Sequence, residues 1–176
     1  EGKPRVVVMT DGEIDDRCSM VHFLLYTNQM QVDAIIQTNS GFQRKGWSSE
    51  PWIEAQLAAY EQVLPNLRVH DAAYPSAEEL RKVVYVGDED PAHIPEGVSF
   101  KTLLPGHEVK INPSDWADTP GSDRLVELLL EEDPRPIFIQ CWGGGNTALR
   151  AFDKLKEAYP AEYDRAIRKA VMYCIW

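Results

Sequence analysis

The sequence contains only three cysteines among its 176 residues, Cys18, Cys141 and Cys174. They are too few and too far apart for a disulfide scaffold or a Cys-x-x-Cys zinc site. One disulfide could form among them, and the sequence does not decide whether it does. We interpret Cys18 and Cys141 as small buried side chains, because no histidine is paired with either of them to make a reactive thiol.

The sequence also lacks any apolar run close to the roughly 20 residues that cross a bilayer, so we expect no membrane-spanning segment. Basic residues are outnumbered: 18 Lys and Arg stand against 28 Asp and Glu, for a net charge of -10. So acidic a surface repels phosphate backbones, and we expect neither nucleic acid nor membrane as a partner. It is compatible with binding a cation or a neutral sugar.

The composition that remains is that of a folded domain. Hydrophobic residues make up 44% and aromatic residues 10% of the chain, which excludes a wholly disordered protein. The chain begins with Glu1 and not with Met. A cleaved export signal or a truncated start would each explain this, and we expect a secreted or periplasmic protein more than a cytoplasmic one.

The amino-terminal part predicts a β-α-β unit. Residues 6–9 are a short β-branched run typical of a buried strand, apolar residues recur at helical spacing over 20–25, and residues 32–37 form a second buried run. Two strands separated by one helix in so short a stretch indicate a parallel pair with a right-handed crossover.

The rest of the chain continues this alternation. The pattern predicts helices over residues 52–64, 77–86, 124–132 and 148–158, and strands over 69–74, 137–140 and 171–175. Pro65 is expected to end the first of these helices, and Ser76 to cap the second with Glu79 three residues on. Residues 88–119 are irregular and are interpreted as a functional or inserted loop. We therefore predict the α/β class: a doubly wound, mostly parallel sheet with helices on both faces.

Two polar loops follow predicted strands, at the sheet edge where α/β proteins bind ligands. The first places four carboxylates, those of Asp11, Glu13, Asp15 and Asp16, within six residues. So much negative charge calls for a compensating cation, and oxygen ligands with room for water favour Ca²⁺ over zinc. The alternative is that these acids cap the following helix, whose amino end favours negative charge.

The second loop, Trp-Gly-Gly-Gly-Asn-Thr at positions 142–147, leads from a strand into a helix. Glycines there allow the backbone to approach a ligand closely, although an ordinary tight turn would also use them. The loop matches neither a P-loop nor the Gly-x-Gly-x-x-Gly dinucleotide fingerprint. Trp142 is the tryptophan most suited to stack on a sugar or base, whereas Trp47, Trp52 and Trp116 are better explained by packing.

The Val-Met-Thr-Asp-Gly-Glu-Ile-Asp-Asp stretch at positions 8–16 resembles the amino-terminal motif of inosine-uridine type nucleoside hydrolases. Together with positions 142–147 and the Asn-Ser-Gly-Phe stretch at 39–42, it is still more similar to the nucleoside hydrolase-like proteins described as cellulose-binding. These stretches are spread along the chain from its first predicted strand toward its end.

This resemblance implies roles for individual residues. Asp11 would bind Ca²⁺ and, as general base, take a proton from a metal-bound water, and Asp16 would be the second calcium ligand. Asp15 would accept a hydrogen bond from a ribose hydroxyl. Asn39 would line the sugar pocket, and Asn146 would contact the substrate, with a backbone carbonyl near it as a further calcium ligand.

The sequence also departs from the nucleoside hydrolases. Gly12 and Glu13 replace their Pro-Gly, and Met9 stands where they have a further Asp. Their late His-Asp pair would lie beyond Trp176. We therefore expect residues 1–176 to form a single nucleoside hydrolase-like domain that lacks its C-terminal part.

Three functions are compatible with these observations. The first is a Ca²⁺-dependent hydrolase of N-glycosidic bonds in nucleoside-like substrates. The second is a non-catalytic carbohydrate-binding protein that retains the same pocket. A Mg²⁺-dependent phosphohydrolase is less well supported, because a second carboxylate cluster and a phosphate-binding lysine are not evident. The sequence leaves open the substrate, whether the protein is an enzyme, and whether it forms a homo-oligomer.

Overall fold

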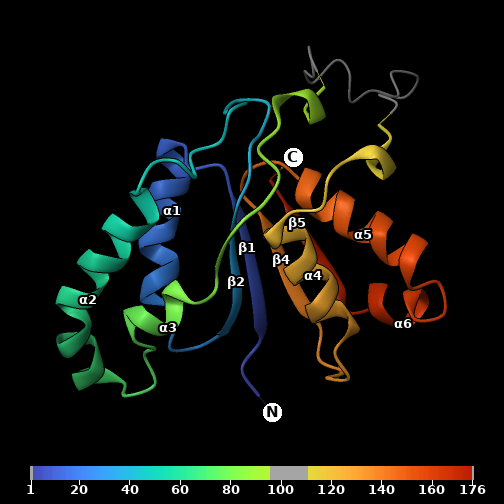
Figure 1. Ribbon diagram of the computed structural model, residues 1–176. Coiled ribbons are helices and arrows are strands. Elements are labelled where there is room, and N and C mark those ends of the chain that lie inside the picture. The colour runs from blue at the N-terminus through green and yellow to red at the C-terminus, as the bar shows by residue number, and fades with distance from the viewer. Residues whose placement is uncertain (1, 96–110, 176) are drawn as a thin grey trace.

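The computed structural model describes residues 2–95 and 111–175, and these form a five-stranded parallel sheet (Figure 1). The strands are β1 (Arg5–Thr10), β2 (Gln31–Gln37), β3 (Val84–Val86), β4 (Ile137–Cys141) and β5 (Ala170–Cys174). Their order in the sheet is β3-β2-β1-β4-β5, and every neighbouring pair is parallel. The strand order reverses direction between β1 and β4, which makes the carboxyl ends of these two strands the topological switch point.

Helices cover both faces of this sheet. One face carries α1 (Ile14–Leu25), α2 (Trp52–His70) and α3 (Ala77–Arg81), and the other carries α4 (Pro120–Leu130), α5 (Asn146–Ala158) and α6 (Tyr163–Ile167) (Figure 1). Short 3-10 turns occupy Pro91–His93 and Pro113–Asp115. The predicted α/β class, with a doubly wound parallel sheet, is confirmed.

β1 is buried along its whole length, as its β-branched sequence predicts. Val6 and Val8 pack toward α1 and α2, whereas Val7 and Met9 pack toward α4 and α5. Each side chain alternates between the two faces because successive residues of a strand point in opposite directions. The central strand thus holds both hydrophobic layers and fixes the position of the loop that follows it.

The amino end of β1 carries a buried ion-pair network. Arg5 is 2% exposed, and its guanidinium donates to Asp33 at 2.6 Å and to Glu131 at 2.7 Å. Burial lowers the pKa of Arg5, but the bonds to the two carboxylates outweigh this and leave the pKa above its ordinary value. Arg5 therefore remains charged although it is buried at the amino end of β1.

The predicted end at Pro65 of the helix over residues 52–64 was wrong. α2 continues through Pro65 to His70, so residues 69–74 do not form the predicted strand. The helix buries Leu57, Tyr60 and Leu64 against the sheet, and this packing outweighs the hydrogen bond that a proline removes.

The predicted helix over residues 77–86 was wrong in its second half. The cap was predicted correctly: Ser76 accepts from the backbone N–H of Glu79 at 3.2 Å, and the Glu79 carboxylate accepts from the N–H of Ser76 at 2.7 Å. The helix nevertheless ends at Arg81, and residues 84–86 form β3 beside β2. Pairing with an existing strand decided the structure of this Val-Tyr-Val segment, which suits a strand by its own composition.

The cysteine interpretation was correct for Cys141, which is buried, and wrong for Cys18, which is exposed. Cys18 lies on the side of α1 that faces away from the sheet. The helical spacing of the residues around it does not by itself show which face of the helix a cysteine occupies. All three cysteines are free thiols. The predicted irregular segment 88–119 is described only at its two ends, and residues 96–110 lie outside the described part.

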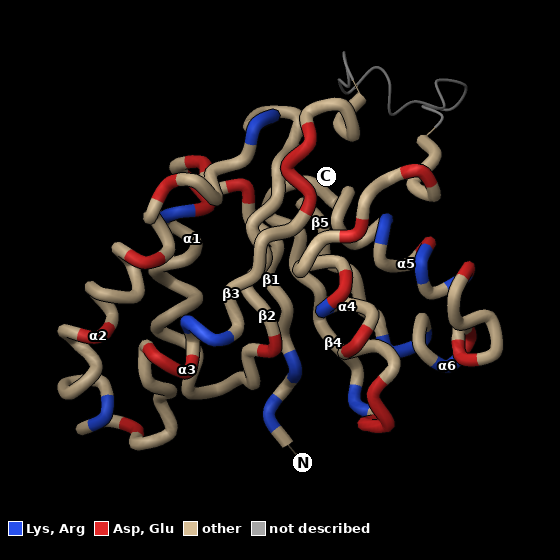
Figure 2. The backbone as a smooth tube through the Cα atoms, viewed as in Figure 1, with Lys and Arg blue, Asp and Glu red and all other residues tan. Residues whose placement is uncertain are grey.

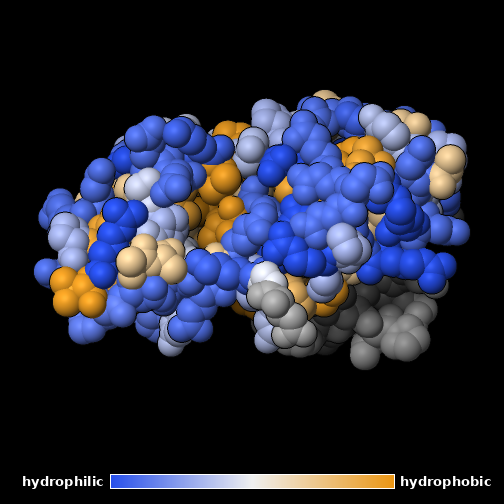
Figure 3. Space-filling view, turned by 90° about the horizontal axis from the view of Figure 1, so that it is seen from below, coloured by the Kyte–Doolittle hydropathy of each residue, from blue (hydrophilic) through white to orange (hydrophobic). Residues whose placement is uncertain are grey.

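The end of the molecule that holds the amino ends of the strands is mostly hydrophilic, with apolar residues gathered near its centre (Figure 3). At the sheet edge, β5 leaves Val171, Met172 and Tyr173 partly exposed. No helix within residues 2–95 and 111–175 has the length and apolar character needed to cross a membrane.

Candidate functional site at the carboxyl edge of the sheet

The carboxyl ends of the strands, together with the loops and helix starts that follow them, carry most of the buried polar residues in the described part of the chain. Asp11 follows β1, Asn39 follows β2, Asp88 follows β3 and Asn146 follows β4, and all four are at most 5% exposed. Figure 2 shows acidic residues on several loops at this end of the sheet, and also along the helices. Since buried polar groups are costly unless they are paired, the contacts among these residues define the site.

The loop after β1 folds back on itself around Asp16. The carboxylate of Asp16 accepts from the Thr10 hydroxyl at 2.6 Å and from the Asp11 backbone N–H at 2.9 Å. The carboxylate of Asp11 accepts from the Glu13 N–H at 3.1 Å, and Gly12 between them has a φ of 76°, which favours glycine. Asp11 and Asp16 are therefore brought together by local turns.

Burial changes the chemistry of the Asp16 carboxyl. Burial raises the pKa of Asp16 to about 6; the Thr10 hydroxyl opposes this, and the negative charge of Asp11 adds to it. Burial also raises the pKa of Glu13, with further contributions from Asp11 and Asp15. The loop thus concentrates negative charge that a cation or a hydrogen-bond donor would stabilise.

Asp15 lies outside this cluster. Its side chain is exposed on the first turn of α1, where its carboxylate accepts from the backbone N–H of Asp16 at 3.1 Å. An acid in this position interacts favourably with the amino end of a helix, as the alternative interpretation of the loop predicts.

The glycines after β4 let three loops approach one another. A Cβ atom added to Gly143 would lie 2.8 Å from the Cβ of Asp11, and one added to Gly144 would meet the carbonyl oxygen of Asn39. The N–H of Gly144 donates to that same carbonyl at 2.9 Å. Side chains at these two positions would therefore push the loops after β1 and β2 away from the loop after β4.

Asn146 joins the loops through its side-chain amide. Its Nδ2 donates to Asn39 Oδ1 at 2.8 Å and to the Asp88 carbonyl at 3.2 Å, and its Oδ1 accepts from the Thr38 hydroxyl at 2.9 Å. Asn39 in turn donates through its Nδ2 to the Arg44 carbonyl at 2.8 Å. Because the amides of Asn39 and Asn146 are bonded to each other and to the backbone, they hold the loops in fixed positions.

Trp142 is half-buried and lies apart from this network. Its ring packs edge-to-face on Phe23 with 5.7 Å between centroids, and its indole N–H donates to Gln140 at 3.1 Å. The structure thus brings Asp11 beside Asp16 and Asn39 beside Asn146, and the glycine turn after β4 lies against both pairs. Asp15 and Trp142 lie outside these two pairs.

A metal site is not evident in the described part of the chain, where no three or more His, Cys, Asp or Glu side chains are gathered as ligands. The acidic loop offers two carboxylates, Asp11 and Asp16. Of the backbone carbonyls near Asn146, that of Gly145 accepts from Leu149 at 2.9 Å within α5. Calcium binding stays a prediction.

Sequence reasoning missed Asp88 and its partners. The Asp88 carboxylate lies 2.7 Å from Nδ1 of His93, whose ring stacks on Trp116 with 4.2 Å between centroids. The Val-Tyr-Val segment just before Gly87 was the available signal, since a strand there would have placed Asp88 at the carboxyl edge.

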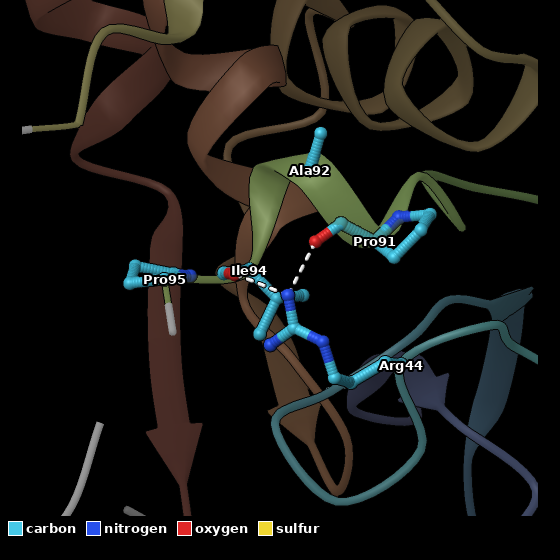
Figure 4. Close-up of a pocket in the computed structure, with 5 residues that line it drawn as sticks. All are labelled: Arg44, Pro91, Ala92, Ile94 and Pro95. Atoms are coloured by element: carbon cyan, nitrogen blue, oxygen red, sulfur yellow. Dashed lines mark hydrogen bonds between the residues drawn. The ribbon is translucent and has the colours of Figure 1, made fainter. Parts of the chain in front are cut away.

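Two open pockets lie beside the network. One, of about 480 Å³, is lined by Arg44, Pro91, Ala92, Ile94 and Pro95. In Figure 4 the Arg44 guanidinium points at the carbonyls of Pro91 and Ile94, to which it donates at 2.7 and 2.8 Å. The other, of about 420 Å³, is lined by Gly12, Glu13, Ile14, Arg17, Gln43 and Trp47. The second pocket directly adjoins the acidic loop.

Comparison with known proteins agrees with this arrangement. The family model described as "Cellulose-binding Sde182, nucleoside hydrolase-like domain" matches residues 5–176. The chain belongs to this family. The resemblance drawn from the acidic loop and the glycine turn is therefore confirmed, and the nucleoside hydrolase-like domain extends over nearly the whole chain.

A solved structure gives the same result for the fold. It is described as a nucleoside hydrolase-related hypothetical protein from Saccharophagus degradans that is associated with carbohydrate metabolism. The two chains share 27% identity with a TM-score of 0.76, over 98% of this chain and 38% of the other. This chain thus spans well under half the length of that relative. No curated protein matches this chain.

Proposed function

We propose that this domain binds carbohydrate at the carboxyl edge of its sheet, with Asp11 as the main acceptor for sugar hydroxyls. The observation that carries the proposal is the buried polar network, in which Asn39 and Asn146 lock the loops around the switch point. The family's cellulose-binding description and the relative's association with carbohydrate metabolism support this choice of ligand. The acidic surface suits a neutral sugar better than an anion.

The chemistry of Asp11 favours this role. The carboxylate is 5% exposed and uses one oxygen to accept from the Glu13 N–H. A carboxylate has several acceptor positions, so it can receive hydroxyl donors as well. Since a hydrogen bond to a charged group contributes about 1.5–3 kcal/mol, losing the charge should weaken binding about tenfold or more.

Calorimetry with cello-oligosaccharides, together with retention on insoluble cellulose, tests the proposal. We expect the wild-type chain to bind and Asp11→Asn to bind about tenfold more weakly. Asp164→Asn, an exposed acid on α6, serves as the matched control. Absence of sugar binding in the wild type, or equal binding by Asp11→Asn, would contradict the proposal.

The Asp11–Asp16 pair favours a second candidate, Ca²⁺-dependent hydrolysis of N-glycosidic bonds. Asp16 is 3% exposed with its pKa raised to about 6, and a bound cation would stabilise its charged form. Asp11 and Asp16 would hold Ca²⁺, which when bound lowers the pKa of a water molecule. Asp11 would accept a proton, and the loops joined by Asn146 would orient the sugar.

Two measurements separate the candidates. If the domain is a hydrolase, it should release base from nucleosides in the presence of Ca²⁺ and not in EDTA. The Asp11→Asn variant should then lose far more turnover than sugar affinity. Calorimetric titration with Ca²⁺ should then give heat for the wild type and not for Asp16→Ala. If no nucleoside releases base and the two proteins titrate alike, the hydrolytic candidate is wrong and the binding function is unaffected.

A further inference from the structure

The pocket next to the acidic loop has the size and lining of a small-molecule site. Its volume of about 420 Å³ falls within the range of about 300–1,000 Å³ that such sites occupy. One wall is the first turn of α1 with Arg17, and the other is the loop after β2 with Gln43 and Trp47. Gly12 and Glu13 directly follow Asp11 and form the boundary with the proposed sugar site.

Trp47 is held in place by its backbone. Its N–H donates to the Glu89 carboxylate at 3.0 Å, and the N–H of Ser48 donates to the same oxygen at 2.9 Å. The preceding Gly46 has a φ of 64°, and a side chain there would meet Glu89. A fixed aromatic side chain loses little conformational entropy when it binds a ligand.

Arg17 is fixed against the same aromatic surface. Its Nε donates to the Gly12 carbonyl at 2.7 Å, and its guanidinium carbon lies 5.2 Å from the centroid of Trp47 and 5.5 Å from that of Trp52. Across residues 2–95 and 111–175, Arg17 takes part in no ion pair. Its remaining N–H donors can therefore bind a ligand oxygen.

Two indole N–H groups next to this pocket have no hydrogen-bond acceptor among the described residues. The indole N–H groups of Trp47 and Trp52 are buried, and the described residues supply neither with a hydrogen-bond partner. Trp52 itself is 5% exposed, and its Nε1 lies close to Gly12. Buried indole N–H groups are normally paired. Because neither nitrogen is exposed, the pocket does not present them to a ligand, and the polar groups that it does present are those of Arg17, Gln43 and Glu13.

The surrounding charges define the ligand class. Glu13 lines the pocket and Asp15 follows two residues later, so an anionic ligand would meet repulsion that Arg17 alone does not balance. A neutral ring with hydroxyl groups suits the wall better: hydroxyls accept from Arg17 and donate to Glu13, and Gln43 can do both. The apolar face of the ring can pack on Trp47.

We propose that this pocket is a second sugar subsite, centred on Trp47 and Arg17, next to the one at Asp11. The preferred ligand is therefore a neutral oligosaccharide of at least two units, with one ring in each subsite. This inference rests on the proposed carbohydrate binding and specifies its substrate class.

Calorimetry of the full chain with glucose, cellobiose and cellotriose tests the inference. For the wild type we expect about a tenfold gain in affinity from glucose to cellobiose. Trp47→Ala should remove this gain and leave glucose affinity unchanged, whereas Trp47→Phe should keep part of it. Phe42→Ala is the matched control, because Phe42 is a 78% exposed aromatic of the same loop that does not line the pocket.

Gln43→Ala removes a half-buried polar side chain from the pocket wall and should reduce the cellobiose gain with little risk to folding. If the wild type binds glucose and cellobiose equally, or if the gain survives both Trp47→Ala and Gln43→Ala, the second subsite is refuted and binding at Asp11 stands. If the wild type binds none of the three sugars, the proposed function fails together with it.

Discussion

Replacing Asp16 by Asn is expected to change how the stability of the protein depends on pH. The pKa of this carboxyl is about 6 in the folded protein, against an ordinary value of 3.8 for aspartate, because burial and Asp11 disfavour its charged form. The folded state therefore binds the proton more tightly than the unfolded state. As pH rises from about 4 to about 6, the unfolded state loses its proton first and the free energy of unfolding falls.

The size of this effect follows from the shift. Two pKa units correspond to about 3 kcal/mol, lost between pH 4 and pH 6 and not regained at higher pH. In Asp16→Asn the amide oxygen can still accept from the Thr10 hydroxyl and the Asp11 N–H, which bond Asp16 at 2.6 and 2.9 Å. Asp16→Asn should therefore keep the turn after β1, and its free energy of unfolding should not fall between pH 4 and pH 6.

Urea denaturation in EDTA, followed at pH values from 4 to 8, measures the difference. The stability of Asp16→Asn relative to wild type should rise by about 2–3 kcal/mol between pH 4 and pH 7. Asp15→Asn, the exposed neighbour on the same turn, should show no such change. A difference between Asp16→Asn and wild type that stays constant with pH would refute the reasoning.

Other substitutions test the packing that supports the site. In thermal or urea unfolding, Gly144→Ala should cost about 1–3 kcal/mol of stability, because its Cβ would meet the Asn39 carbonyl, and it should also weaken sugar binding. Gly145→Ala is the control: its Cβ would have nothing within 4 Å, so stability should change by less than about 0.5 kcal/mol. Arg5→Met should cost about 3–5 kcal/mol in urea unfolding at neutral pH, since it leaves the buried carboxylate of Asp33 on β2 without its charged partner. An unchanged unfolding midpoint would contradict this. Ser76→Ala should cost about 1 kcal/mol by removing the cap of α3, and no loss of stability would show that the cap is dispensable.

The first β-α-β unit could be predicted because its signals are local. A short apolar run such as residues 6–9, with three valines, is typical of a buried strand, and the polar break after Thr10 marks where it ends. The acidic loop was found for the same reason: its members are adjacent in sequence. Turns between near neighbours, such as the bonds that Asp16 makes to Thr10 and Asp11, need no distant partner.

The errors arose where distant partners decided the structure. α2 passes through Pro65 because Leu57 and Leu64 on the same face are buried in the core. Residues 84–86 pair with β2, some fifty residues earlier in the chain, and this placed Asp88 at the carboxyl edge. Helix periodicity does not show whether packing in the core outweighs a proline, nor which strand residues 84–86 pair with.

The sequence by itself determined the α/β class, the acidic loop after the first strand and the glycine turn after the fourth, because each depends on residue types within a few positions. Only the tertiary structure decided that Asn146 reaches Asn39 and Asp88, that Asp15 and Trp142 stand apart, and that Trp47 and Arg17 line one pocket. These contacts join separate strands of the sheet, and their geometry is set by strand order and packing, which no local pattern specifies.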